Sequence, residues 1–160
     1  MSIRAEGIAI HRSPSDFAEI VRDRVARITK RARPVGSVIT CACPEGVVGN
    51  CDRERFATVV DALLDNAVKF GRGQPIEVAL VVEGAWVELS VRDHGIGFSP
   101  DRLGAFFDPF ERGVAREHFG GLGLGLYVAK AIVDAHGGSI RATSSPGEGA
   151  TFVVRLPLSA

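Results

Sequence analysis

The stretch Asp65-Asn66-Ala67-Val68-Lys69-Phe70 is the first of three ordered segments that decide the fold of this chain. The second is Asp93-His94-Gly95-Ile96-Gly97, and the third is Gly121-Leu122-Gly123-Leu124-Gly125-Leu126. Each segment alone is a weak signal, because glycine runs and an Asp beside glycines commonly form ordinary turns. In this order they predict one nucleotide site, which holds an adenine, a metal and a triphosphate on one face of a single domain.

Asn66 and Lys69 lie three residues apart on a predicted helix over residues 52–70, so they share a face of it. The apolar face of the same helix is offset from them and consists of Phe56, Val59, Val60, Leu63, Leu64 and Ala67. An amide oxygen is a hard, neutral ligand suited to Mg²⁺, and an ammonium group suits phosphate. The alternative is a solvated helix end, where Asn and Lys are common.

Asp93 follows a predicted strand over residues 86–91 and precedes Gly95 and Gly97. A carboxylate can accept a hydrogen bond from the exocyclic amine of adenine. Glycines let the backbone approach the ring closely. The alternative is a tight turn that the Asp side chain caps.

The glycines of the third segment precede a predicted helix over residues 124–136. Successive amides without side chains form an anion-binding nest, and the helix N-terminus adds positive potential. The segment is not a P-loop, because no Gly-Lys-Ser/Thr follows, and its spacing is not that of a dinucleotide fingerprint. The alternative is a flexible hinge.

The remaining pattern predicts a mixed sheet with helices on one face, because strands follow one another in pairs. A first helix is expected over residues 14–32, with Ser13 as its cap and Pro14 at its first position. Residues 108–120 have no period and predict a mobile loop. The expected strands are residues 3–11, 35–40, 76–82, 86–91, 139–144 and 150–156.

Composition predicts one ordinary globular domain over residues 1–160. The formal net charge of zero argues against a general nucleic-acid binder. No apolar run is long enough to span a bilayer, and the N-terminus lacks a signal-peptide core, so we expect a cytoplasmic, monomeric domain without membrane contact. Any anchor of a membrane-bound parent protein lies outside this chain. The three cysteines are expected to be free thiols.

Four boxes in order make the whole chain resemble the catalytic, ATP-binding domain of bacterial sensor histidine kinases. That domain belongs to the ATPase family shared with gyrase, Hsp90 and MutL. The N box resembles residues 63–70 and the G1 box residues 93–97. The F box resembles Phe106-Phe107-Asp108-Pro109-Phe110-Glu111-Arg112, and the G2 box residues 121–126. The segments His136-Gly137-Gly138 and Gly147-Glu148-Gly149-Ala150-Thr151-Phe152 resemble the family's closing hairpin.

The resemblance implies an α/β fold, a two-layer sandwich of the Bergerat type, in which three helices cover one face of a mixed, mostly antiparallel sheet. It implies ATP and Mg²⁺ as cofactors, with Asn66 as the metal ligand and an ATP lid over about residues 111–120. The implied catalytic residues are Asn66, Lys69 and Arg112, of which Lys69 contacts a phosphate and Arg112 reaches the terminal one. The residues implied to bind the nucleotide are Asn66, Lys69, Phe70, Asp93, Gly95, Gly97, Phe110, Gly121, Leu122, Gly123 and Leu124.

Two departures from the family pattern bear on the reaction. Relatives that hydrolyse ATP carry a Glu four residues before the Asn, where this chain has Ala62, which activates no water. The family's phosphoacceptor histidine is also absent, since His11 of His11-Arg12-Ser13-Pro14 directly precedes the first predicted helix. We therefore expect a kinase domain that phosphorylates a histidine on a separate dimerisation domain, with a response regulator as the further partner. The alternatives are a degenerate adaptor of the same fold and an anti-sigma-factor-type serine kinase.

Overall fold

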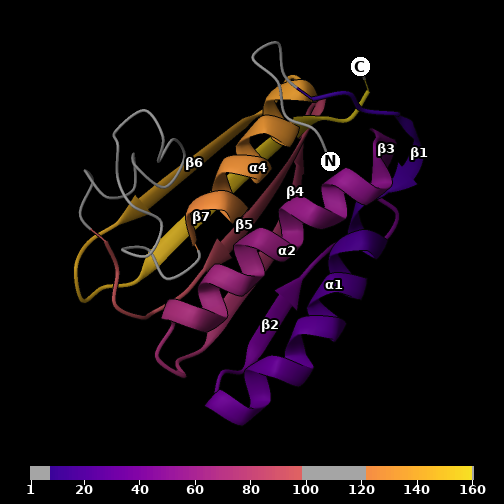
Figure 1. Cartoon of the computed structure of the whole chain (residues 1–160). Helices are drawn as coiled ribbons and strands as arrows, with labels where there is room; N and C mark the ends of the chain where they lie inside the picture. Colours follow the sequence, from indigo (N-terminus) through magenta and orange to yellow (C-terminus); the bar gives the residue numbers. More distant parts are fainter. Residues whose placement is uncertain (1–7, 99–121, 160) are drawn as a thin grey trace.

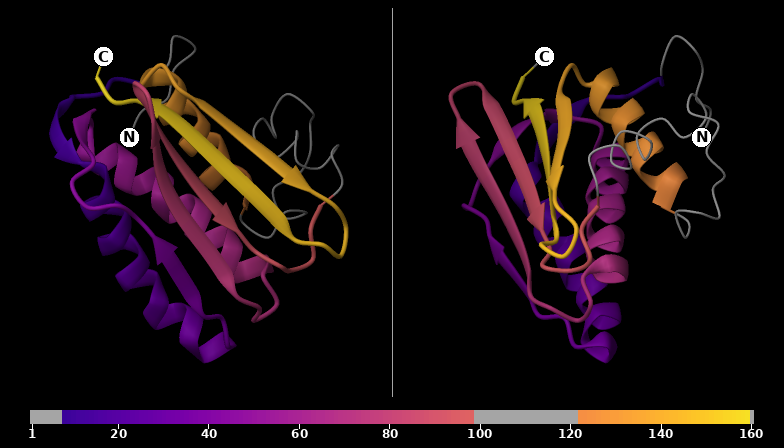
Figure 2. Two further views of the ribbon diagram at one scale, coloured as in Figure 1. Left: turned by 180° about the vertical axis from the view of Figure 1, so that it is seen from behind. Right: turned by 90° about the vertical axis from the view of Figure 1, so that its left-hand side faces the viewer.

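The structure is a computed structural model that describes residues 8–98 and 122–159. Within these ranges, three helices and a five-stranded sheet are present. Figures 1 and 2 show the helices as one layer on one face of the sheet. The helices are α1 (Phe17–Ala32), α2 (Arg53–Phe70) and α4 (Leu122–Ala135). The strands of this sheet are β2 (Ile39–Ala42), β4 (Ile76–Glu83), β5 (Trp86–Arg92), β6 (Ser139–Ser144) and β7 (Ala150–Pro157).

The strand order β2-β4-β5-β7-β6 makes the sheet mixed and mostly antiparallel, as the sequence predicted. β4 pairs with β5, β5 with β7 and β6 with β7, all antiparallel. Among the described strands, β2 and β4 alone pair in parallel, because α2 lies between them in the chain and returns it to the same end of the sheet.

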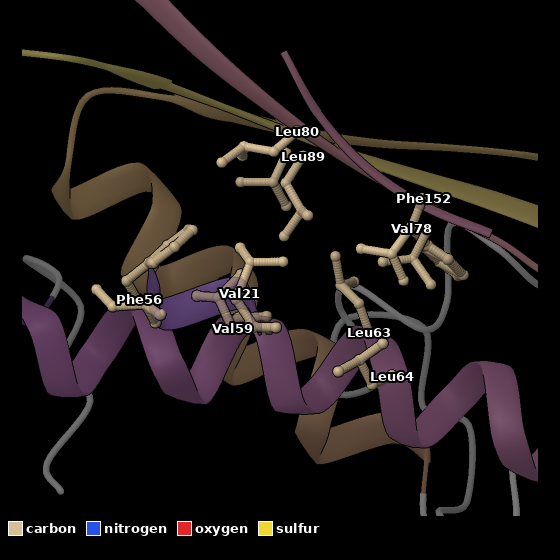
Figure 3. Packing of buried hydrophobic residues seen from close by; sticks show 14 of the residues in the cluster. Val21, Phe56, Val59, Leu63, Leu64, Val78, Leu80, Leu89 and Phe152 are labelled. Carbon is tan, nitrogen blue, oxygen red and sulfur yellow. The ribbon is translucent and has the colours of Figure 1, made fainter. Parts of the chain in front are cut away.

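The core lies between the helices and the sheet. Figure 3 shows Phe56, Val59, Leu63 and Leu64 of α2 in one cluster with side chains of the strands, toward which Leu63 points. These are the apolar positions of α2 predicted from the sequence, and each is at most 1% exposed. On the sheet, alternate residues of β4, β5 and β7 are buried, which is the period of a sheet with one covered face.

The predicted start of the first helix was wrong. Ser13 and Pro14 belong to a short strand, β1 (Ser13–Asp16), which pairs antiparallel with β3 (Val48–Cys51), a strand that the sequence analysis did not predict. The helix begins at Phe17, and its cap is Asp16, whose carboxylate accepts hydrogen bonds from the N–H groups of Ala18 and Glu19 at 3.0 and 3.3 Å. The capping residue therefore lies three positions later than the sequence signal indicated.

Two predicted strands also differ from the structure. Residues 8–11 of the predicted strand over 3–11 form no strand, and its first residues lie outside the described ranges. The strand predicted over 35–40 begins only at Ile39, because Arg33–Val35 form a 3-10 turn that ends at Gly36 with a left-handed φ of 87°. A proline in this turn and the following glycine keep the backbone out of an extended conformation.

His136 joins the C-terminal end of α4 to the start of α2. Its Nε2 accepts a hydrogen bond from the backbone N–H of Asp52 at 3.0 Å, and its Nδ1 donates to the carbonyl of Ile132 at 2.8 Å. The ring is 2% exposed, and burial lowers the pKa of His136 below its ordinary value of 6.5. The imidazole is therefore neutral, and this is the form that can accept the Asp52 bond.

Candidate nucleotide-binding site

The first two predicted segments meet at one end of the sheet. The carbonyl of Phe70, the last residue of α2, accepts a hydrogen bond from the N–H of Ile96 at 3.0 Å. The carbonyl of Ile96 in turn accepts from the N–H of Gly147, in the turn between β6 and β7, at 2.6 Å. The end of α2, the segment after β5 and the closing hairpin thus form one hydrogen-bonded unit.

Asp93 lies at the centre of this unit and is only 5% exposed. Its Oδ1 accepts hydrogen bonds from the backbone N–H groups of Gly95 at 2.9 Å and of Ala150 at 3.3 Å. Burial raises the pKa of Asp93 above its ordinary value, and the two backbone hydrogen bonds oppose that shift. Both bonds fall on Oδ1, so they also fix the orientation of the carboxylate and the direction in which Oδ2 points.

Gly95 and Gly97 are required by close backbone contacts. A Cβ atom on Gly95 would lie 1.7 Å from the carbonyl oxygen of Phe70, and one on Gly97 would lie 1.9 Å from that of Ser145. Gly97 also has a left-handed φ of 65°. The close approach in the structure is to other backbone segments of the chain. The predicted approach of these glycines to an adenine ring stays a prediction.

Phe70 and Phe98 form an aromatic pair beside the carboxylate segment. Their ring centroids lie 5.4 Å apart at an interplanar angle of 69°, an edge-to-face contact. Ser144 holds this region to the hairpin, since its hydroxyl accepts from the N–H of Phe98 at 2.8 Å and donates to the carbonyl of Gly149 at 2.6 Å. An apolar ring surface therefore lies next to a single buried carboxylate, which is a combination suited to a flat heterocycle with an amine.

Asn66 and Lys69 lie near the end of α2 and differ in burial. Asn66 is 8% exposed, and its Nδ2 has no hydrogen-bond partner within the described ranges, whereas Lys69 is exposed. A buried amide without a partner costs about 1–3 kcal/mol. Such a side chain fits a site in which a ligand completes its hydrogen bonding.

The start of α4 packs beside α2 close to Asn66. A Cβ atom on Gly125 would lie 4.0 Å from the Cβ of Ala62, which is one turn before Asn66. The helix begins at Leu122, two residues before the predicted start, so Gly123 and Gly125 lie inside it. The free backbone amides of a helix's first turn can bind anions. With the earlier start, this turn consists of Leu122, Gly123 and Leu124.

The carboxylates next to Asn66 on α2 are engaged in ion pairs. Asp61 accepts two hydrogen bonds from Arg24 of α1, at 2.8 and 2.6 Å, and Asp65 pairs with Arg31 at 2.7 Å. Within residues 8–98 and 122–159 no group of three His, Cys, Asp or Glu side chains converges on a possible metal position. A divalent cation at Asn66 would therefore need oxygen ligands from a bound phosphate and from water, as Mg²⁺ commonly has.

Part of the predicted site lies outside the described residues, namely Phe110, Arg112, Gly121 and the lid over about 111–120. Residues that sequence analysis did not assign to the site also contribute to it. Ala150 supplies the second N–H to Asp93, and Ser144 joins the hairpin to Phe98. No local pattern shows these contacts, because Ala150 is 57 residues from Asp93 in the chain.

Comparison with known proteins identifies the family of this chain. Residues 51–160 match the family model described as histidine kinase-, DNA gyrase B- and HSP90-like ATPase. The sensor protein KdpD of Escherichia coli is 40% identical over 125 residues, which are 77% of this chain and 14% of KdpD. This chain therefore corresponds to a small part of that relative.

Two solved structures have the same fold. The catalytic domain of the histidine kinase ThkA, in a nucleotide-free form, has a TM-score of 0.82 and 22% identity over 94% of this chain and 100% of that one. Full-length ShkA in complex with AMPPNP has a TM-score of 0.81 and 26% identity over 94% of this chain and 32% of that one. With its matched family model and its kinase-like fold, this chain belongs to the histidine kinase-, DNA gyrase B- and HSP90-like ATPases and has the ATPase domain of sensor histidine kinases.

Proposed function

We propose that this chain binds Mg²⁺-ATP and donates the γ-phosphoryl group to a histidine on a separate dimerisation domain, from which a response regulator receives it. The observation that carries the proposal is the fixed carboxylate of Asp93. Two backbone N–H groups hold Oδ1, so Oδ2 is the atom available to the exocyclic amine of adenine. Phe70 and Phe98 supply apolar surface beside the ring.

Asn66 is the residue that we assign to the metal, and Lys69 to a phosphate. The fit rests on the buried, unpartnered amide of Asn66 and on the preference of Mg²⁺ for oxygen ligands, of which substrate phosphates supply several. A side-chain flip exchanges the ends of an amide, so Oδ1 can take the position that faces the ligand. When bound, Mg²⁺ neutralises charge on the phosphates.

The triphosphate would lie between Asn66 and the start of α4. The first-turn amides of α4, at Leu122, Gly123 and Leu124, suit the phosphates because a helix N-terminus carries positive potential. Gly121, Arg112, Phe110 and the lid complete the proposal from outside the described residues. We assign Arg112 to the terminal phosphate.

Transfer to a partner is favoured over hydrolysis because α2 offers no base for water. Ala62 stands one turn before Asn66, and the nearest carboxylates, Asp61 and Asp65, are paired with arginines of α1. A general base typically contributes about 10²–10⁴-fold to a rate. The chain's own residues thus bind and orient ATP, and the nucleophile comes from the partner histidine.

None of the described helices combines the length and the apolar character that a bilayer crossing needs. We propose a cytoplasmic domain whose parent protein holds the histidine-bearing dimerisation helices. The alternatives remain a degenerate adaptor, which binds no ATP, and an anti-sigma-factor-type serine kinase, which phosphorylates serine.

The test combines calorimetry with a transfer assay. The chain should bind ATP in the presence of Mg²⁺ and release little phosphate when incubated with labelled ATP alone. Acid-labile, histidine-linked label should appear when a histidine-bearing dimerisation domain is added. No ATP binding would support the adaptor, and label on serine would support the serine kinase. Rapid phosphate release by the chain alone, abolished in Asn66→Ala, would show an ATPase.

A further inference from the structure

Two of the three free cysteines form a close pair away from the nucleotide site. Cys41 lies in β2, and Cys43 follows the end of that strand. Residues two apart in an extended chain direct their side chains to the same side. The two Sγ atoms are 2.9 Å apart, so they are in direct contact, and either thiol could be the donor.

The pair is held in place by its surroundings. β2 is the outermost strand of the five-stranded sheet, so the thiols lie at an edge, and both are half-buried against the core. Arg22 of α1 donates hydrogen bonds to the carbonyls of Cys43 at 3.0 Å and of Pro44 at 2.7 Å. The backbone that carries Cys43 is therefore anchored to the helix layer, and the sulfurs meet without rearrangement.

The chemistry of the pair favours oxidation over metal binding. A structural metal site needs about four ligands, and no third His, Cys, Asp or Glu joins the pair among the described residues. Burial, followed by the hydrogen bond with Cys41, raises the pKa of Cys43 to about 12. The Cys43 thiol therefore keeps its proton at neutral pH. We assign the first attack to Cys41, whose sulfur lies against that of Cys43.

We propose that Cys41 and Cys43 form a reversible intramolecular disulfide when the protein meets a peroxide. Cys41 gives its proton to solvent, its thiolate attacks one peroxide oxygen, and the O–O bond breaks. Cys41 becomes a sulfenic acid, and the departing hydroxide takes a proton back from solvent to leave as water. The sulfur of Cys43 then attacks the Cys41 sulfur, the S–O bond breaks, and its proton leaves with the oxygen as a second water. In balance, two thiols and one hydrogen peroxide give one disulfide and two waters.

The backbone geometry permits this bond with some strain. Two steps along a strand separate the Cα atoms by about 6.6 Å, near the upper end of the roughly 4.4–6.8 Å found in disulfides. A strained disulfide is more easily reduced. We therefore expect glutathione to restore both thiols, which makes the site reversible.

The experiment counts thiols in the intact chain after mild treatment with hydrogen peroxide. The protein is denatured, alkylated and weighed by mass spectrometry, and its peptides are mapped. We expect two of the three cysteines to resist alkylation, a mass loss of two hydrogen atoms, a Cys41–Cys43 link within one peptide, and recovery of all three thiols with glutathione. Cys51→Ser serves as the matched control and should keep the response.

Cys41→Ser and Cys43→Ser should each abolish the linked peptide, with unchanged circular dichroism. The inference is overturned if the wild-type thiols oxidise only to sulfinic or sulfonic acids, if Cys51 supplies one half of the disulfide, or if only intermolecular dimers form. It is also overturned if all three thiols can still be alkylated after the peroxide treatment. Protection of the thiols from alkylation by added Zn²⁺, without a disulfide, would indicate a metal site and would overturn it as well. Because the wild-type map decides each outcome, a variant that failed to fold would leave the inference testable.

Discussion

The substitution Asp93→Asn tests the adenine assignment most directly, because the hydrogen bonds around Asp93 dictate how the new amide must lie. The backbone N–H groups of Gly95 and Ala150 donate to the position of Oδ1. An Asn side chain satisfies them only if its oxygen occupies that position, which places its NH₂ where Oδ2 was. The NH₂ then faces the adenine amine, donor against donor.

The loss can be estimated from one hydrogen bond. A hydrogen bond to a charged group contributes about 1.5–3 kcal/mol, which corresponds to roughly 10- to 150-fold in ATP affinity. Guanine carries an acceptor oxygen where adenine carries its amine. The affinity for GTP should therefore fall less than the affinity for ATP, or should rise.

Without nucleotide at neutral pH, the Asp93→Asn protein should be at least as stable as the wild type. Burial raises the pKa of Asp93, so the folded state binds this proton more readily than the unfolded state does. Its stabilising contribution is present below the unfolded pKa and is lost as the pH rises through the folded one. At neutral pH the ionised carboxylate therefore costs stability, which a neutral Asn relieves.

Calorimetry with ATP and GTP, together with urea unfolding, measures both effects. Asp134→Asn is the matched control, since Asp134 is an exposed carboxylate on α4 paired only with Lys130 in the described contacts. Wild-type ATP affinity in a natively folded Asp93→Asn protein would refute the adenine assignment. An equal loss of ATP and GTP affinity would refute the donor-against-donor argument.

Three further predictions concern the metal, the backbone cradle and the pH dependence of stability. In Asn66→Ala, calorimetry with and without Mg²⁺ should show a loss of at least about tenfold in Mg²⁺-ATP affinity; an undiminished effect of Mg²⁺ would exclude Asn66 as its ligand. Gly95→Ala should lower the free energy of unfolding in urea by about 3 kcal/mol or more, since its Cβ would meet a backbone oxygen at 1.7 Å. Gly125→Ala, with its nearest contact at 4.0 Å, should be neutral or stabilising. Equal effects of the two substitutions would contradict the close backbone approach at Gly95. Burial lowers the pKa of His136, so the stabilising contribution of its neutral form is present above the unfolded pKa of about 6.5 and is lost as the pH falls through the folded pKa. The urea midpoint of the wild type should therefore drop as the pH falls through this range, and that of His136→Gln should drop less. Parallel pH profiles of the two proteins would count against this role.

Much of the architecture could be predicted from local patterns. The apolar period of residues 52–70 predicted α2 and its buried face, and the alternation over 76–82 and 86–91 predicted β4 and β5. These signals are readable because a residue's burial in a regular element repeats at 3.6 or 2 positions. The mixed sheet and the single helical face were confirmed.

The start of the chain could not be read in the same way. Ser13-Pro14 carries a helix-start signal, yet these residues pair with β3, a strand of four residues that includes Gly49 and Asn50 and has little strand propensity of its own. The pairing partner is more than thirty residues away. A rule based on neighbouring residues does not include that contact. Because residues 13–16 pair with β3, the helix is capped by Asp16 and not by Ser13.

The sequence by itself determined which residues the candidate site can use: an Asp before two glycines, an Asn and a Lys on one helix, a glycine-rich start to another, and Ala62 in place of a base. Only the tertiary structure decided how these groups are held. Ala150 orients Asp93, and the carbonyls of Phe70 and Ser145 forbid a side chain on Gly95 and Gly97. Two arginines of α1 pair with Asp61 and Asp65 of α2. Residue types and short spacings are written along the chain, whereas hydrogen bonds and steric limits between distant segments exist only once those segments meet.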